Sequence, residues 1–140
     1  MNTNLLNEIY QNAEMGRNTL MSVIKRTDDT NFRIVLEEQL TEYEKIFDQA
    51  DQMIKEGGAQ PTEGSGFSKM TSEVMASLKT MANSSPEYLA KMIVQGSTMG
   101  VTNITKAIND NQETDKKYLS LAKALLKTEE NNIEEMKKFL

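Results

Sequence analysis

Carboxylates are the side chains of this sequence that could bind a metal ion. Four of them lie in predicted helices that could bring them together. Glu14 and Glu42 lie in the first two helical stretches, and Glu129 and Glu130 lie in the last. Carboxylate and amide oxygens are the ligands that hard cations such as Mg²⁺, Ca²⁺ or Mn²⁺ prefer. A site built from carboxylates alone, holding Fe or Mn, is therefore one hypothesis for this chain.

The absence of two residue types narrows that chemistry. Neither histidine nor cysteine occurs among the 140 residues, which excludes disulfides, imidazole acid–base catalysis, thiolate chemistry and nucleophiles activated by histidine. Zinc sites lose their usual ligands for the same reason. No other catalytic constellation is recognisable. We therefore expect a protein that is not an enzyme and that binds neither a metal nor a cofactor.

Polar residues at helix positions that should face a core form the most informative pattern. Counting back from the expected turns places Gln39, Gln95 and Glu129 near one level at the middle of a bundle. Because an unpaired buried charge is costly, Arg17 is the candidate ion-pair partner for Glu129, and Tyr43 is the candidate hydroxyl donor. The favoured interpretation of this polar layer is a hydrogen-bond network that fixes helix register. A hard-cation site and di-iron chemistry are the alternatives.

The elements that carry these residues are predicted by apolar positions at three- and four-residue spacing, which is typical of amphipathic helices. We expect one helical domain over residues 1–140, with helices over about 3–27, 29–57, 67–82, 86–110 and 113–139.

Capping signals and breaks agree with that assignment. Gly57-Gly58 ends the second helix, and Ser85 caps the helix that begins with Pro86. Short polar turns at 27–30 and 109–112 then predict two antiparallel hairpins, and the long connection between the hairpins must cross the bundle.

Two helical hairpins joined by a long crossover make the chain resemble the ferritin-like superfamily. Within it, Gly57-Gly58 and Pro61, followed by Gly64-Ser65-Gly66 and Met75-x-x-Leu78-Lys79, resemble an uncharacterised group of small bacterial four-helix proteins. The resemblance implies an all-α, antiparallel four-helix bundle of two hairpins, with a short extra helix in the crossover.

The same resemblance bears on metal binding. Members of the superfamily that bind two irons carry Glu-x-x-His on one helix of each hairpin. The matching positions here read Gln39-x-x-Glu42 and Glu129-x-x-Asn132, so both histidines and one glutamate are replaced. The resemblance therefore implies a degenerate metal site.

Two glycines four residues apart, Gly96 and Gly100, lie inside the helix predicted over 86–110. Each costs about 1 kcal/mol relative to alanine within a helix, so the close approach of another element should compensate. Packing inside the bundle, against the crossover helix or the first helix, is the favoured interpretation. A dimer contact and a local helix bulge are the alternatives.

The net charge and the hydropathy pattern indicate whether the chain should bind nucleic acid, span a membrane or be exported. The formal net charge is −5, whereas nucleic-acid affinity depends on lysines and arginines that displace counterions. No apolar run approaches the ~20 residues that span a bilayer, and the first residues lack a basic region before an apolar core. We expect a cytoplasmic protein that binds no nucleic acid and does not span a membrane.

These patterns favour a bundle that acts by protein association, as a homo-oligomer, in particular a homodimer, or with a helical protein partner. The alternative function is a carboxylate-only metal-binding or redox bundle with a degenerate di-iron site. A structural role at a spore or envelope is a third hypothesis, which depends on fold analogy alone.

Overall fold

The computed structural model describes residues 4–58, 76 and 84–140. In this part of the chain the regular structure is helical throughout, which confirms the all-α class. The helices are α1 (Asn4–Ile24), α2 (Thr30–Glu56), α4 (Pro86–Asp110) and α5 (Lys116–Lys137). The short helix predicted over 67–82 falls, except for Ala76, outside the described residues.

Side-chain caps determine where the helices of the two hairpins begin. The Asp29 carboxylate accepts a hydrogen bond from the Phe32 amide at 2.9 Å, which starts α2 at Thr30. Asp115 accepts one from the Lys117 amide at 2.8 Å. Because these oxygens satisfy amides that have no partner within the helix, α5 begins after Asp115 rather than at 113 as predicted.

The predicted cap and stop signals around the connection are also present. The Ser85 hydroxyl accepts a hydrogen bond from the Tyr88 amide at 3.3 Å, and Pro86 occupies the first turn of α4. Gly58, just after α2, has a φ of +76°, a left-handed conformation that glycine adopts at little cost.

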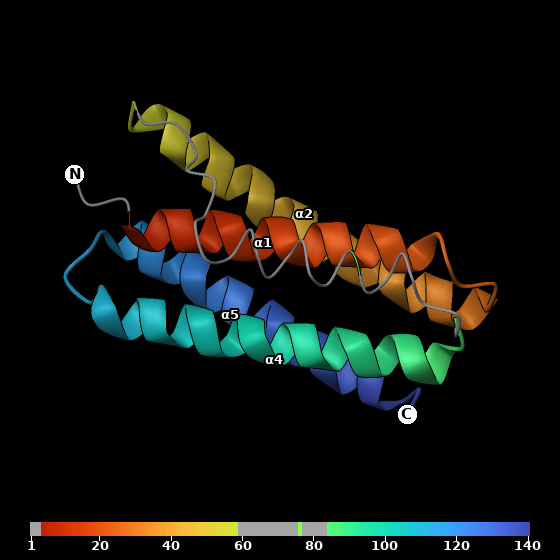
Figure 1. Cartoon of the computed structure of the whole chain (residues 1–140). Coiled ribbons are helices and arrows are strands. Elements are labelled where there is room, and N and C mark those ends of the chain that lie inside the picture. Colours follow the sequence, from red (N-terminus) through yellow and green to blue (C-terminus); the bar gives the residue numbers. More distant parts are fainter. Residues whose placement is uncertain (1–3, 59–75, 77–83) are drawn as a thin grey trace.

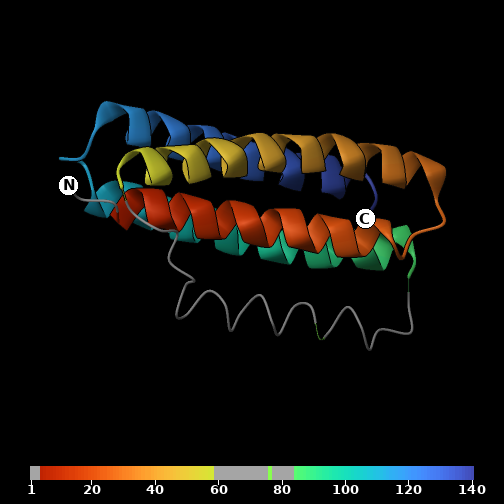
Figure 2. The ribbon, with the colours of Figure 1, turned by 90° about the horizontal axis from the view of Figure 1, so that it is seen from above.

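The four helices pack as two antiparallel hairpins, α1 with α2 and α4 with α5 (Figure 1). In addition α1 packs against α4, and α2 packs against α5. Figure 2 accordingly shows α1 and α4 in one layer and α2 and α5 in the other. Since α2 ends at one end of the bundle and α4 begins at the opposite end, these two helices run in the same direction (Figure 1).

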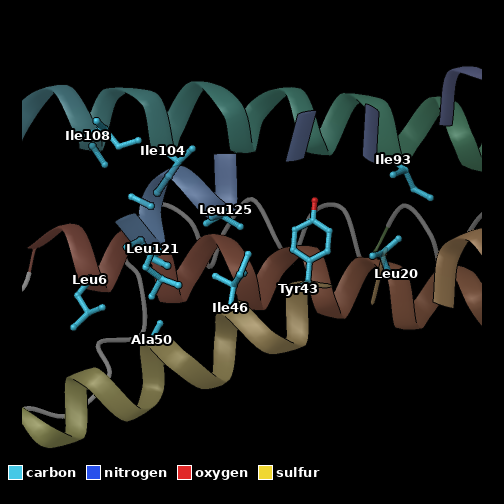
Figure 3. Packing of buried hydrophobic residues seen from close by; sticks show 14 of the residues in the cluster. Leu6, Leu20, Tyr43, Ile46, Ala50, Ile93, Ile104, Ile108, Leu121 and Leu125 are labelled. Carbon is cyan, nitrogen blue, oxygen red and sulfur yellow. The ribbon is translucent and has the colours of Figure 1, made fainter. Parts of the chain in front are cut away.

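One aliphatic core runs between the four helices (Figure 3). Burying a leucine or isoleucine side chain stabilises the fold by about 1.5–3 kcal/mol. The Phe32 and Phe139 rings close one end of the core, edge to face, with centroids 4.8 Å apart. Tyr43 stands within the core, and its hydroxyl points away from α2 towards α4 (Figure 3).

Gly16 allows α1 to pack directly on the Tyr43 ring. A Cβ atom at Gly16 would lie 2.4 Å from Cε1 of Tyr43, far inside van der Waals contact. The Tyr43 side chain is 1% exposed, so the ring has no solvent into which to move. The close packing of the first hairpin therefore requires glycine at this position.

We expect Gly16→Ala to lower the free energy of unfolding by about 1–3 kcal/mol, because the added methyl group overpacks a closed core. Gly96→Ala is the matched control, since a Cβ there meets nothing within 4 Å; it should raise stability by up to about 1 kcal/mol through helix propensity. Urea unfolding followed by circular dichroism measures both. Equal stability of Gly16→Ala and the unaltered chain would contradict the packing argument.

Candidate functional site

A carboxyl group is buried at the middle of the bundle. Glu129 on α5 is 2% exposed. Tyr43 on α2 donates a hydrogen bond to its Oε2 at 2.8 Å, and Ser97 on α4 also hydrogen bonds to this carboxyl group. The contact therefore links α5 to one helix of the first hairpin and to its own hairpin partner.

Asn132 extends this cluster by one helical turn along α5. Its Nδ2 donates a hydrogen bond to Ser97 Oγ at 3.0 Å, and the residue is 1% exposed. Its Oδ1 is buried and has no hydrogen-bond partner among the described residues. An unsatisfied buried oxygen costs about 1–3 kcal/mol, so this acceptor is a notable feature of the cluster.

Gly100 on α4 provides the space for the Glu129 carboxyl group. A Cβ atom at Gly100 would lie 2.7 Å from both Cδ and Oε1 of Glu129. Within the described residues, the close approach at this glycine therefore involves a side chain of α5, whereas the first helix or the crossover helix was expected. Gly96 differs, because a Cβ there would meet nothing within 4 Å. A dimer contact at Gly96 stays a prediction.

A small cavity lies beside the carboxyl group. Its volume is about 20 Å³, which holds one particle of the size of a water molecule. All four helices contribute to its wall, with Met15, Gly16, Thr19, Leu20, Tyr43, Ile93, Gly96, Ser97, Glu129 and Asn132.

Burial controls the ionisation of the two acidic groups in the cluster. Desolvation raises the pKa of Glu129 from 4.5 to about 8, against the hydrogen bonds from Tyr43 and Ser97, which lower it. Desolvation also raises the pKa of Tyr43 well above its ordinary value of 10, and the nearby Glu129 adds to that shift. Near neutral pH both groups are therefore mostly uncharged, and the carboxyl group carries a proton of its own.

The two amides of the predicted polar layer are less buried than the carboxyl cluster. Gln95 is exposed, because Ile93 and Ser97 face the core and a residue midway between them on a helix points the other way. Its predicted place in the core is corrected accordingly. Gln39 is half-buried, and its Oε1 is buried without a hydrogen-bond partner among the described residues.

Arg17 does not serve as the ion-pair partner of Glu129. Its guanidinium carbon lies 4.1 Å from the centroid of the Phe47 ring, and its Nε and Nη2 donate to Asn18 Oδ1 at 3.3 Å. Cation–π contact with Phe47 keeps the arginine half in solvent, where its charge avoids the cost of burial in the core.

The candidate metal ligands do not converge. Glu42 and Glu130 are exposed, and Glu14 is half-buried, whereas Glu129 is buried. Glu42 instead accepts a hydrogen bond from Lys45 Nζ at 3.4 Å. No group of three or more acidic side chains suited to a metal occurs in residues 4–58, 76 and 84–140.

The sequence contained signals for the residues that the predicted layer omitted. Asn132 follows Glu129 by three positions, so both lie on one face of α5. Ser97 precedes Gly100 by three positions on the inward stripe of α4. The contacts of these side chains across helices could not be read from spacing within one helix.

Fold and site together define an all-α bundle of two helical hairpins, with a mostly uncharged carboxyl cluster at its centre. The chain belongs to the family described as domain of unknown function DUF2383, whose model matches residues 1–110. That match includes α1, α2 and α4 and stops before α5, which carries Glu129 and Asn132. Neither a curated protein nor a solved structure matches the chain. None of the helices described here is long and apolar enough to cross a membrane.

The pKa of Glu129 predicts a pH-dependent stability. Since the folded-state pKa of about 8 exceeds the ordinary 4.5, the folded state holds the proton more tightly than the unfolded chain. This stabilisation is complete below about pH 4.5 and is lost as the pH rises to about 8, a change on the order of a few kcal/mol. Urea unfolding across this pH range measures it.

Glu129→Gln should remove this particular pH dependence, because an amide mimics the uncharged acid at every pH. The matched control is Glu130→Gln, which makes the same change at the exposed neighbour and should keep the original slope. Parallel profiles for Glu129→Gln and the unaltered chain would show that Glu129 is ionised in the folded state at neutral pH.

Proposed function

We propose that this chain is a ferritin-like bundle that functions by associating with a second copy of itself, without catalysing a reaction. The ferritin-like assignment is supported by the pairing of α1 with α2 and α4 with α5, and by the shared direction of α2 and α4, which is the arrangement of two hairpins joined by a long crossover.

The proposed self-association is supported by the position of the exposed large hydrophobic side chains. Four occur among the described residues: Met21, Ile34, Tyr88 and Leu140, with 42%, 50%, 38% and 60% of their surface exposed. They belong to the last turns of α1, the first turns of α2 and α4, and the C-terminus, which all lie at the same end of the bundle (Figure 1). We call this end the apolar end.

Large apolar side chains exposed at one end of the bundle favour association, because removing them from water releases free energy in proportion to their area. A second copy is the partner that the charges favour. Exposed Lys25 and Arg33 lie at this end together with exposed Asp28 and Glu87. Two copies related by a twofold axis present the same surface to each other, and a surface with both signs can place unlike charges opposite.

The central cluster supports a role without catalysis. Its cavity of about 20 Å³ admits no substrate larger than a few atoms. The chain also lacks the imidazole and thiol groups that most often act as bases and nucleophiles near neutral pH.

Ile34→Glu should weaken the self-association, because it places a charge on the apolar end. Sedimentation velocity over a concentration series measures the dimer dissociation constant, which we expect to rise by at least about tenfold for a loss of ~1.4 kcal/mol. Ala124→Glu, which changes an exposed apolar residue on α5, is the control and should dimerise like the unaltered chain. An unaltered chain that sediments as a monomer throughout the series would disprove the proposal.

The competing function is a metal-binding or redox bundle, and it makes a different prediction. Because Glu42 and Glu130 are exposed while Glu129 is buried, we expect protein purified without a chelator to contain iron and manganese far below one ion per chain. Elemental analysis by mass spectrometry measures both metals. One or more ions per chain would favour the metal-binding alternative over the association.

A further inference from the structure

An open groove lies on the surface between α2 and α5, in the half of the bundle opposite to the apolar end (Figure 1). Its volume is about 420 Å³. Half-buried Met53 of α2, together with Leu121 and Ala124 of α5, forms its apolar part, and exposed Lys116 and Lys117 also line it. We call this surface the basic groove.

The first half of α5 carries positive charge only. Residues 116–128 contain no acidic residue and four lysines, all of them exposed: Lys116, Lys117, Lys123 and Lys127. Helical spacing places Lys116, Lys123 and Lys127 on the same side of α5 as Ser120, which also lines the basic groove. Because like charges four positions apart destabilise a helix, this row of lysines does not serve the stability of the chain itself.

None of these four lysines forms an ion pair in the part of the chain that the structure describes. Five other lysines each pair with an acidic residue three or four positions away: Lys45, Lys55, Lys106, Lys137 and Lys138. The two acidic residues next to the row have other contacts. Asp115 accepts a hydrogen bond from the backbone amide of Lys117, and Glu129 is buried against Tyr43. The four ammonium groups are therefore available to carboxylates of another molecule.

We infer that the basic groove binds an acidic amphipathic helix of a partner protein. A groove between two helices can receive the apolar face of a third helix, and carboxylates along the sides of that helix would lie against the lysines of α5. A membrane surface fits less well. Lipid-binding helices insert large hydrophobic side chains, and the four that are exposed among the described residues all lie at the apolar end. Binding in the basic groove does not depend on the proposed self-association, which uses that opposite end.

The test uses a synthetic, fluorescently labelled helical peptide of ~20 residues, with leucine along one face and glutamate on the others. Fluorescence anisotropy with the full chain measures its dissociation constant. The chain should bind this peptide, less tightly as salt screens the charges, and should not bind a matched peptide with lysine in place of glutamate.

Charge reversal locates the binding surface. The double variant Lys116→Glu, Lys117→Glu should raise the dissociation constant of the acidic peptide by at least about tenfold. Lys91→Glu makes the same change at an exposed lysine of α4 and is the control, which should bind the peptide like the unaltered chain.

Two variants separate the basic groove from the apolar end. Ala124→Glu should lose the peptide and keep the dimer, whereas Ile34→Glu should keep the peptide and weaken the dimer. No binding of the acidic peptide, equal binding of the two peptides, or unchanged binding by the double variant would overturn the inference. Binding of phosphatidylserine vesicles in place of the peptide would overturn it in favour of a membrane, and loss of the dimer in the double variant would assign the groove to a second copy instead.

Discussion

A carboxyl group can remain inside an apolar core only if its charge is removed or compensated, and much of the structure at mid-bundle follows from this constraint on Glu129. Tyr43 and Ser97 supply hydrogen bonds from α2 and α4, yet burial still outweighs them in setting the ionisation of Glu129. Hydrogen bonds alone therefore do not make the charged form stable here. The carboxyl group instead carries a proton near neutral pH, and the hydrogen bonds to it come from two different helices.

The same level of the bundle is also where the helices fit most closely. Gly16 faces the Tyr43 ring, and Gly100 faces the carboxyl group that the Tyr43 hydroxyl contacts. Each large side chain thus lies opposite a residue without one. A shift of any helix along its axis would place a Cβ atom against the ring or the carboxyl group, so steric fit and hydrogen bonding select the same helix register.

The sequence predicted the four helices that the structure describes and several of their ends, because helical periodicity and capping act between residues only a few positions apart. The caps at Asp115 and Ser85 are examples of such local effects, although the former moves the start of α5 beyond the predicted position. The site was less predictable. Levels counted from the turns do not say which way a side chain points, so Gln95 was misplaced, and Arg17 stacks on Phe47, a contact that depends on how α1 and α2 pack.

The residues of the carboxyl cluster come from two parts of the chain, the matched family region and α5. The matched family region, residues 1–110, contributes the tyrosine, the serine and both closely packed glycines, while the acidic group they surround is on α5. Without α5, the Tyr43 hydroxyl would lack the Glu129 oxygen that accepts its hydrogen bond at 2.8 Å. Residues of α2 and α4 at this level therefore fit around the Glu129 side chain of α5.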